Sequence, residues 1–282
     1  MLENLIPRAP PLAVTSAATI ALILAFMALL AIVEAAIPLR ARGQWNGRHL
    51  GPNLALTFLT FATNFVLNLA IVAALVWLQS TGGGLFNVVR VAPPWATLGV
   101  VLSLDFSFYV AHVAMHKVPL FWAFHKVHHC DPAVDVTTSL RQHPVEGVIR
   151  YVFIALVAFP LGAGPAAFAV YRTWSALNAL LEHANIRAPA WLDGLLSLIT
   201  TWPLMHKVHH SRNPDETDSN YGNIFSWWDR LFFTFTKSSR GAEIAYGLEG
   251  HDAPAQQTVA GLLAMPFQDP KLGQPSEARQ TL

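Results

Sequence analysis

Two long stretches of the chain contain no charged residue, and they restrict its possible folds more than any other feature. They cover residues 9–33 and 53–89, and the expected helix of the second is 54–79. An α-helix of ~20 apolar residues crosses the ~30 Å hydrocarbon core of a bilayer. Charged residues make up only 12% of the chain, whereas an average soluble domain has ~25%. Both stretches therefore predict transmembrane helices. A signal peptide is the alternative for the first, but Glu34 follows it where a cleavage site needs small residues.

Two further apolar segments follow along the chain. One begins near Pro94 and runs through Asp105 to the first clustered histidines, and the other covers 148–183. The second segment is too long for one span and short for two, and the turn-forming sequence LGAGP at 161–165 divides it. We expect a helical hairpin that dips into the bilayer or just crosses it. The chain is thus predicted to be an all-α integral membrane protein with about four transmembrane or membrane-dipping helices.

Basic residues indicate how these helices are oriented. The first loop carries Arg40, Arg42 and Arg48, and the segment after the third helix carries Lys117, Lys126, Arg141 and Arg150. The second loop has only Arg90. Because lysine and arginine favour the cytoplasmic side, the first loop and everything after the third helix are expected in the cytoplasm. We expect a multi-pass protein of the inner (cytoplasmic) membrane, with an amphipathic segment at the interface at 191–205 and a loose tail at 267–282.

Histidines form three short clusters. The first is HVAMH at 112–116, and the second and third are the same pentapeptide, HKVHH, at 125–129 and 206–210. Histidines three or four positions apart share one face of a helix, so a single turn offers several nitrogen atoms to a metal. Eight of the twelve histidines lie in these clusters: His112, His116, His125, His128, His129, His206, His209 and His210. His49 and His251 stand alone and are expected to be interfacial or hydrogen-bonding residues rather than ligands.

The number of clustered histidines predicts two metal ions. A zinc enzyme uses three protein ligands, whereas two octahedral ions with positions left for oxygen need roughly eight to ten donors. Imidazole binds iron, copper, zinc and nickel alike, so the residue type leaves the metal open. The only cysteine, Cys130, is expected to be a spectator, and cysteine-based zinc or iron–sulfur sites are excluded. The net charge of +1 gives no indication of a nucleic-acid partner.

The motifs resemble those of a known family, the sterol desaturase and fatty acid hydroxylase superfamily of membrane di-iron proteins. Its pattern, H-x(3–4)-H followed by two H-x-x-H-H motifs, is met by the three clusters. Further matches are Trp122, RQHPVE at 141–146, NYG at 220–222 and WDRLF at 228–232. The resemblance runs from about His112 to Thr234. One position departs from it, because Phe233 stands where the family usually has glycine.

This resemblance implies two iron ions in a cytoplasmic helical cap, which use O2 to hydroxylate or desaturate a C–H bond of a lipid. It also implies an additional ligand between the second and third clusters, for which His183 is the candidate. Asp105 and Glu182 are candidates for carboxylates that orient the ligands, and His143 is expected to be structural or to face the substrate. No G-x-G-x-x-G fingerprint occurs, so electrons are expected from a separate reductase with a ferredoxin or a b-type cytochrome.

The resemblance divides the chain into three regions. Residues 1–94 are predicted to form the N-terminal membrane helices and loops, 95–240 a catalytic region of the fatty acid hydroxylase type, and 241–282 a C-terminal tail. Three other functions compete: a zinc-dependent membrane hydrolase, a metal transporter, and a non-catalytic protein that binds lipid or metal. The substrate stays open among sterols, fatty acyl chains, carotenoids and amino-lipid head groups.

Overall fold

The computed structural model describes residues 12–41, 46–237 and 243–268. Within these ranges the chain is helical, with isolated β-bridges and no strand. The elements are α1 (Leu12–Ala36), α2 (Asn46–Ser80), α3 (Leu85–Val88), α4 (Pro93–Lys117), α5 (Pro119–His129), η2 (Val136–Leu140), α6 (Pro144–Leu161), α7 (Pro165–His183), α8 (Ala190–Leu196), α9 (Pro203–His209), α10 (Pro214–Thr217), α11 (Trp227–Leu231), α12 (Val259–Ala264) and η4 (Met265–Gln268).

Four helical segments are long and apolar enough to cross a membrane: Ala17–Ala36, Arg48–Val88, Pro93–Lys117 and Pro144–Leu161. They match the three predicted spans and the first half of the predicted hairpin. Large hydrophobic side chains are exposed on them, for example Ile32 (68%), Phe58 (61%) and Leu156 (67%). Such side chains favour lipid over water as their surroundings. The prediction of an all-α membrane protein is confirmed.

The predicted hairpin is formed by α6 and α7, and its turn is closed by glycine. Gly162 has a φ of +69°, and Gly84, in the loop before α3, has a φ of +87°. A Cβ atom on Gly84 would lie 2.3 Å from the Cα atom of Gly162. The two loops therefore touch backbone to backbone, which requires glycine at both positions.

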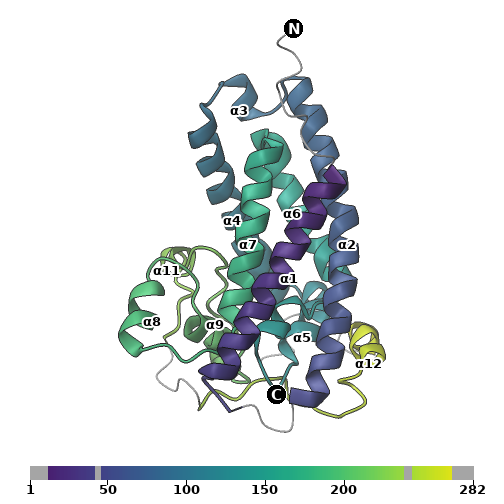
Figure 1. Cartoon of the computed structure of the whole chain (residues 1–282), viewed down its shortest axis with the longest axis vertical. Coiled ribbons are helices and arrows are strands. Elements are labelled where there is room, and N and C mark those ends of the chain that lie inside the picture. Colours follow the sequence, from purple (N-terminus) through teal and green to yellow (C-terminus); the bar gives the residue numbers. More distant parts are fainter. Residues whose placement is uncertain (1–11, 42–45, 238–242, 269–282) are drawn as a thin grey trace.

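The long helices form a bundle whose core connects α2, α4, α6 and α7 (Figure 1). Leu75, Leu104, Ile154 and Phe168, one from each helix, are buried in a single hydrophobic cluster. At the lower end of the bundle in Figure 1 lie α5 and α9, while α8 and α11 cover one flank. Proline opens both α5 and α9, where its missing N–H removes no helical hydrogen bond.

The structure adds detail to two segments expected from the sequence. Residues 191–205 are divided between two helices, because α8 ends at Leu196 and α9 begins at Pro203. The loose tail expected at 267–282 begins within η4, which extends to Gln268. Just before it, Met265 is buried with Leu56 and Val127 in one cluster. Residues 269–282 lie outside the described part of the chain.

Candidate dimetal centre

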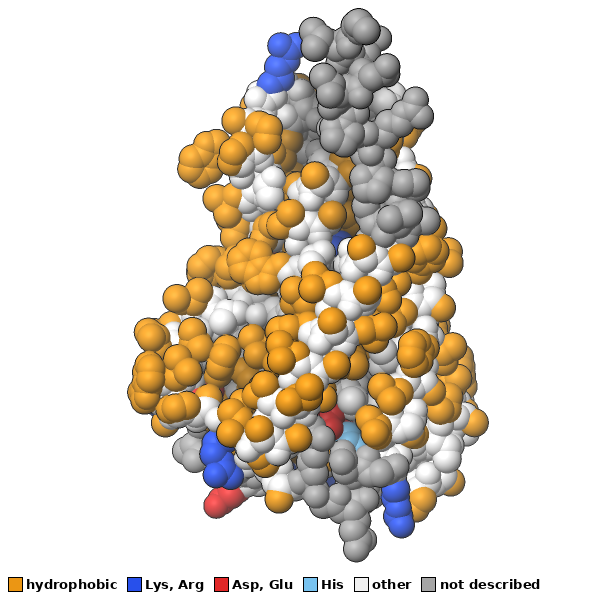
Figure 2. All heavy atoms as spheres, in the orientation of Figure 1, with side chains coloured by type: hydrophobic (Ala, Val, Ile, Leu, Met, Phe, Trp, Pro, Cys, Tyr) orange, Lys and Arg blue, Asp and Glu red, His pale blue; other side chains and the backbone are white. Residues whose placement is uncertain are grey.

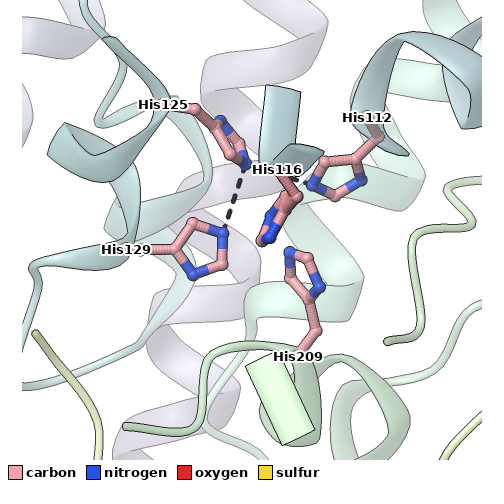
Figure 3. Close-up of side chains that lie close together, drawn as sticks. All are labelled: His112, His116, His125, His129 and His209. Carbon is pink, nitrogen blue, oxygen red and sulfur yellow. Dashed lines mark hydrogen bonds between the residues drawn. The ribbon is translucent and has the colours of Figure 1, made fainter. Parts of the chain in front are cut away.

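All nine histidines predicted as ligands are buried and lie in two groups. In each group, one potential ligand atom from every residue lies within 4.8 Å of all the others. We call the groups site A and site B. Site A, drawn in Figure 3, consists of His112, His116, His125, His129 and His209, and site B of His128, His183, His206 and His210. The structure therefore brings His183 into contact with the clustered histidines.

The two HKVHH motifs divide their histidines between the sites in opposite ways. On α5, His125 and His129 belong to site A and His128 to site B, whereas on α9 the outer pair belongs to site B and His209 to site A. With 3.6 residues per turn, residues i+3 and i+4 both lie one turn above residue i, but they are displaced around the helix in opposite directions. Neighbouring histidines of one motif can therefore point into different sites. The sites are adjacent, because the rings of His129 and His210 stack with their centroids 4.5 Å apart.

The separations between nitrogen atoms fit metal coordination. In site B, the Nε2 atom of His183 lies 3.0 Å from His128 Nε2, 3.0 Å from His206 Nε2 and 3.1 Å from His210 Nε2. One imidazole nitrogen carries a single proton or a single lone pair, so three hydrogen bonds at this atom are impossible. Bonds of ~2.1 Å at right angles, in contrast, place neighbouring ligand nitrogens ~3.0 Å apart.

Site A shows the same features. His125 Nε2 lies 3.2 Å from both His112 Nε2 and His129 Nε2. The Nε2 atoms of His116 and His209 are buried and have no hydrogen-bond partner within the described residues. A buried nitrogen without a partner is unfavourable, and a cation at the centre of the group removes this penalty. Both sites therefore fit a metal ion.

The other ring nitrogen of several ligands is held by the fold. The Nδ1 atoms of His112, His183 and His209 donate to the carbonyl groups of Tyr221, Ala179 and Ser219 at 2.8, 2.7 and 2.7 Å. These bonds fix the proton on Nδ1 and leave the lone pair of Nε2 directed into the site. The partners at 219 and 221 flank Asn220, whose φ is +56°.

Two carboxylates lie beside histidines of site A, and neither was proposed from the sequence to orient a ligand. His116 Nδ1 donates to Asp218 Oδ1 at 3.2 Å, and His125 Nδ1 lies 3.2 Å from Glu146 Oε1. Glu146 occurs in the RQHPVE motif, which was the only signal for it. Asp218 is brought to His116 by the loop after α10, far along the chain, so local spacing gave no indication of it.

Of the two carboxylates proposed from the sequence, Glu182 lies beside site B and Asp105 lies elsewhere. Asp105 accepts hydrogen bonds from the backbone N–H groups of Ile224 and Phe225 and from Trp228 Nε1, at 3.0, 3.1 and 2.9 Å. It holds the loop before α11 rather than an imidazole, so that part of the prediction is wrong. Glu182 Oε1 lies 3.8 Å from both His183 Nδ1 and His206 Nε2, next to site B.

Burial keeps the ligands in their metal-binding form. For the histidines of α5 and α9, burial first and the neighbouring histidines second lower the pKa below the ordinary value of 6.5. A proton and a metal ion compete for the same lone pair. At neutral pH, therefore, these imidazoles are uncharged and can act as ligands.

The remaining histidines and the cysteine are not part of either site. His143 caps α6 by accepting a hydrogen bond from the Val145 N–H. His49 is buried, 3.3 Å from Asp131 Oδ1 and 3.4 Å from Asp135 Oδ2, which agrees with the expected hydrogen-bonding residue. Cys130 is buried, and its Sγ donates a hydrogen bond to the Val127 carbonyl and accepts one from the Arg141 guanidinium group. Each has a structural partner that accounts for its position.

Fold and site together define a class: helical membrane proteins with two adjacent histidine sites able to hold metal. The family described as fatty acid hydroxylase matches residues 97–234. The match covers slightly less than half of the chain, and together with the relatives described below it supports the superfamily of fatty acid hydroxylases and sterol desaturases. The resemblance stated from the motifs is confirmed.

Curated relatives cover only part of this chain. Alkylglycerol monooxygenase of Caenorhabditis elegans is 32% identical over 155 residues, which are 55% of this chain and 30% of the relative. Ornithine lipid hydroxylase of Rhizobium tropici is 30% identical over 170 residues, 60% of this chain and 49% of the relative. A cholesterol 25-hydroxylase-like protein of Danio rerio is 29% identical over 151 residues, 52% of this chain and 57% of the relative. No solved structure matches the chain.

Proposed function

We propose that the chain is an O2-dependent lipid hydroxylase that holds iron in both sites. The observation that carries the proposal is the arrangement of nine buried histidines in two adjacent groups. Two neighbouring sites with imidazole ligands and no thiolate suit iron in oxidative chemistry. When bound, the two irons would supply the reductive activation of O2 that an unactivated C–H bond requires.

The residues of this chain position and shield that chemistry. The histidines of sites A and B hold the metals, and their neutral state is maintained by burial. The carbonyl groups of Tyr221, Ala179 and Ser219 and the carboxylates of Glu146 and Asp218 fix the ring orientations. Tyr221 is itself fully buried against His112 and His116, which excludes water from this side of site A.

The overall reaction would convert a C–H bond, one O2, two electrons and two protons into a C–OH group and water. The electrons would come from a separate reductase with a ferredoxin or a b-type cytochrome, since the sequence has no nucleotide-binding fingerprint. The relatives' names contain alkylglycerol, ornithine lipid and cholesterol. We propose a bilayer lipid as the substrate, and hydroxylation rather than desaturation as the reaction.

The distribution of basic residues supports a cytoplasmic position for both sites, in an inner-membrane protein. The first loop and the region after α4 carry the lysines and arginines. The histidine sites lie at the same end of the bundle as the start of α2 (Figure 1). Electrons from soluble carriers in the cytoplasm would then reach the sites without crossing the membrane.

Comparative mass spectrometry of lipids tests the proposal. Cells that produce the protein should contain a lipid that gains one oxygen atom, +16 mass units, and cells with His129→Ala should lack it. Metal analysis of the purified protein should give two irons per chain. A single zinc ion together with a hydrolysed lipid would contradict the oxygenase and favour a zinc hydrolase.

A further inference from the structure

Two segments that are far apart in the sequence form an apolar lobe on one flank of the molecule. We define the apolar lobe as residues 190–199 and 224–233. Ser226 ties the two segments together, because its Oγ donates to the Ser197 carbonyl at 2.7 Å and its N–H to the Ile199 carbonyl at 3.3 Å. Eight large hydrophobic side chains of the lobe are exposed: Trp191, Leu195, Leu198, Ile199, Trp227, Leu231, Phe232 and Phe233.

Charged groups are withdrawn from the outer surface of the lobe. Asp229 is buried and accepts hydrogen bonds from the N–H groups of Tyr221 and Gly222. The guanidinium group of Arg230 lies 4.1 Å above the ring of Phe235 and donates to the Ser226 carbonyl. Asp193 is partly buried. The lobe therefore presents hydrocarbon, whereas contiguous apolar patches of this kind are rare on surfaces that face water.

Phe233 has two features that conflict in water. Its φ is +59°, in the left-handed region where a side chain is strained, and 95% of its surface is exposed. The turn is needed, because it lets the Thr234 N–H donate to the Asp229 carbonyl at 2.8 Å. Glycine would make the same turn without strain. A phenylalanine here is favourable only if its ring has an apolar environment outside the protein.

The lobe continues the apolar surface of the helical bundle. On α7, Trp174 is 45% exposed and its ring contacts Phe225 at 5.5 Å, which in turn stacks on Trp227 at 4.4 Å. Figure 2 shows hydrophobic side chains over both the bundle and the flank of α8 and α11, with the charged groups mostly at the two ends of the molecule. The surface expected to face lipid thus extends onto the lobe without interruption.

We propose that the apolar lobe is inserted into the hydrocarbon of the adjoining leaflet, with Phe233 as its anchor. The lobe is then part of the membrane-embedded surface and not a cap surrounded by water. It is also linked to site A, because Asp229 holds the backbone at Tyr221, whose carbonyl accepts from His112. This proposal rests on the membrane location of the helices and is independent of the reaction.

A spin label at position 233 tests the insertion. Phe233→Cys is made in a Cys130→Ser background, with the protein in phosphatidylcholine vesicles, and its accessibility to O2 and to a water-soluble nickel chelate is measured. The label should be relaxed by O2 and protected from the chelate. The control is Asp215→Cys on α10, an exposed position, which should be reached by the chelate. Equal access of the chelate at both positions overturns the proposal, as does protection from both relaxants, which would indicate a second protein chain on the lobe.

A matched pair of variants tests the role of the Phe233 ring. A label at Trp227→Cys reports the depth of the lobe, and Phe233→Gly is compared with Phe233→Leu. Phe233→Gly relieves the strain but removes the anchor, so access of the nickel chelate to position 227 should increase severalfold. Phe233→Leu keeps an apolar side chain and should leave it unchanged. If neither variant alters the access, Phe233 is not the anchor.

Discussion

The Nε2 atoms of His128 and His183 lie 3.0 Å apart, although the two residues belong to different helices, α5 and α7. His206 and His210, from α9, approach the same nitrogen of His183 at 3.0 and 3.1 Å. His183 is therefore the common neighbour of all the other histidines of site B. Its Nδ1–H is held by the Ala179 carbonyl, so the ring is in position before a metal binds.

Replacement of His183 should affect one metal ion and leave the other. His183→Ala is expected to lower the iron content from two ions per chain to one, because site A keeps its five histidines. His183→Gln should behave similarly, since an amide oxygen is a poor substitute for imidazole on iron. Metal analysis measures the content, and His251→Ala is the control with two ions. Two ions in His183→Ala would show that site B is complete without it.

Adjacent histidines of one motif should control different metals. His128 belongs to site B and His129 to site A, so His128→Ala should weaken metal binding in site B only, and His129→Ala in site A only. Spectroscopy of the protein loaded with Co²⁺ distinguishes the two remaining sites, because their ligand sets differ. Identical spectra for the two variants would contradict the assignment of His128 and His129 to different sites.

Carboxylates that hold an imidazole should affect metal affinity, and a carboxylate that holds a loop should not. Glu146→Gln and Asp218→Asn are expected to weaken metal binding ~10–100-fold, as measured by competition with a chelator. Asp105→Asn is the matched control. It should lower the thermal stability, because Asp105 accepts three hydrogen bonds from the loop and from Trp228, while the affinity of folded protein for metal stays near normal. If Asp105→Asn weakens metal binding more than Glu146→Gln and Asp218→Asn do, the roles given to these three carboxylates are wrong.

His49→Ala should destabilise the protein without removing a ligand. The change leaves Asp131 and Asp135 buried without their shared partner, and breaking a buried ion pair costs about 3–5 kcal/mol. Thermal unfolding should show this loss, while the folded fraction still binds two metal ions. A loss of metal at unchanged stability would assign His49 to the site instead.

The sequence was sufficient for the spans and for the clustering of eight candidate ligands, because both are encoded locally. Hydrophobic length predicts a span, and histidines three or four positions apart share a helical face whatever the helix packs against. His183 was found only through the family resemblance, since no second histidine lies near it. Asp218 and the Tyr221 carbonyl reach their imidazoles through loop structure about a hundred residues away, which no local pattern encodes. The strain at Phe233 also needed the structure, although the missing glycine pointed to that position.

The side of the membrane on which the sites lie can be tested by cysteine labelling in a Cys130→Ser background. Ser211, next to the third cluster, is buried and unsuitable. Thr81 and Asp215 are exposed. Thr81 follows α2 directly, on the side away from the histidine sites, whereas Asp215 is on α10, which contacts α9. A membrane-impermeant reagent applied to intact cells should label Thr81→Cys and miss Asp215→Cys. After the cells are opened, it should label both, which shows that position 215 is accessible. If Asp215→Cys is labelled in intact cells and Thr81→Cys is not, the histidine sites face outward. Soluble cytoplasmic reductases are then excluded as direct electron donors.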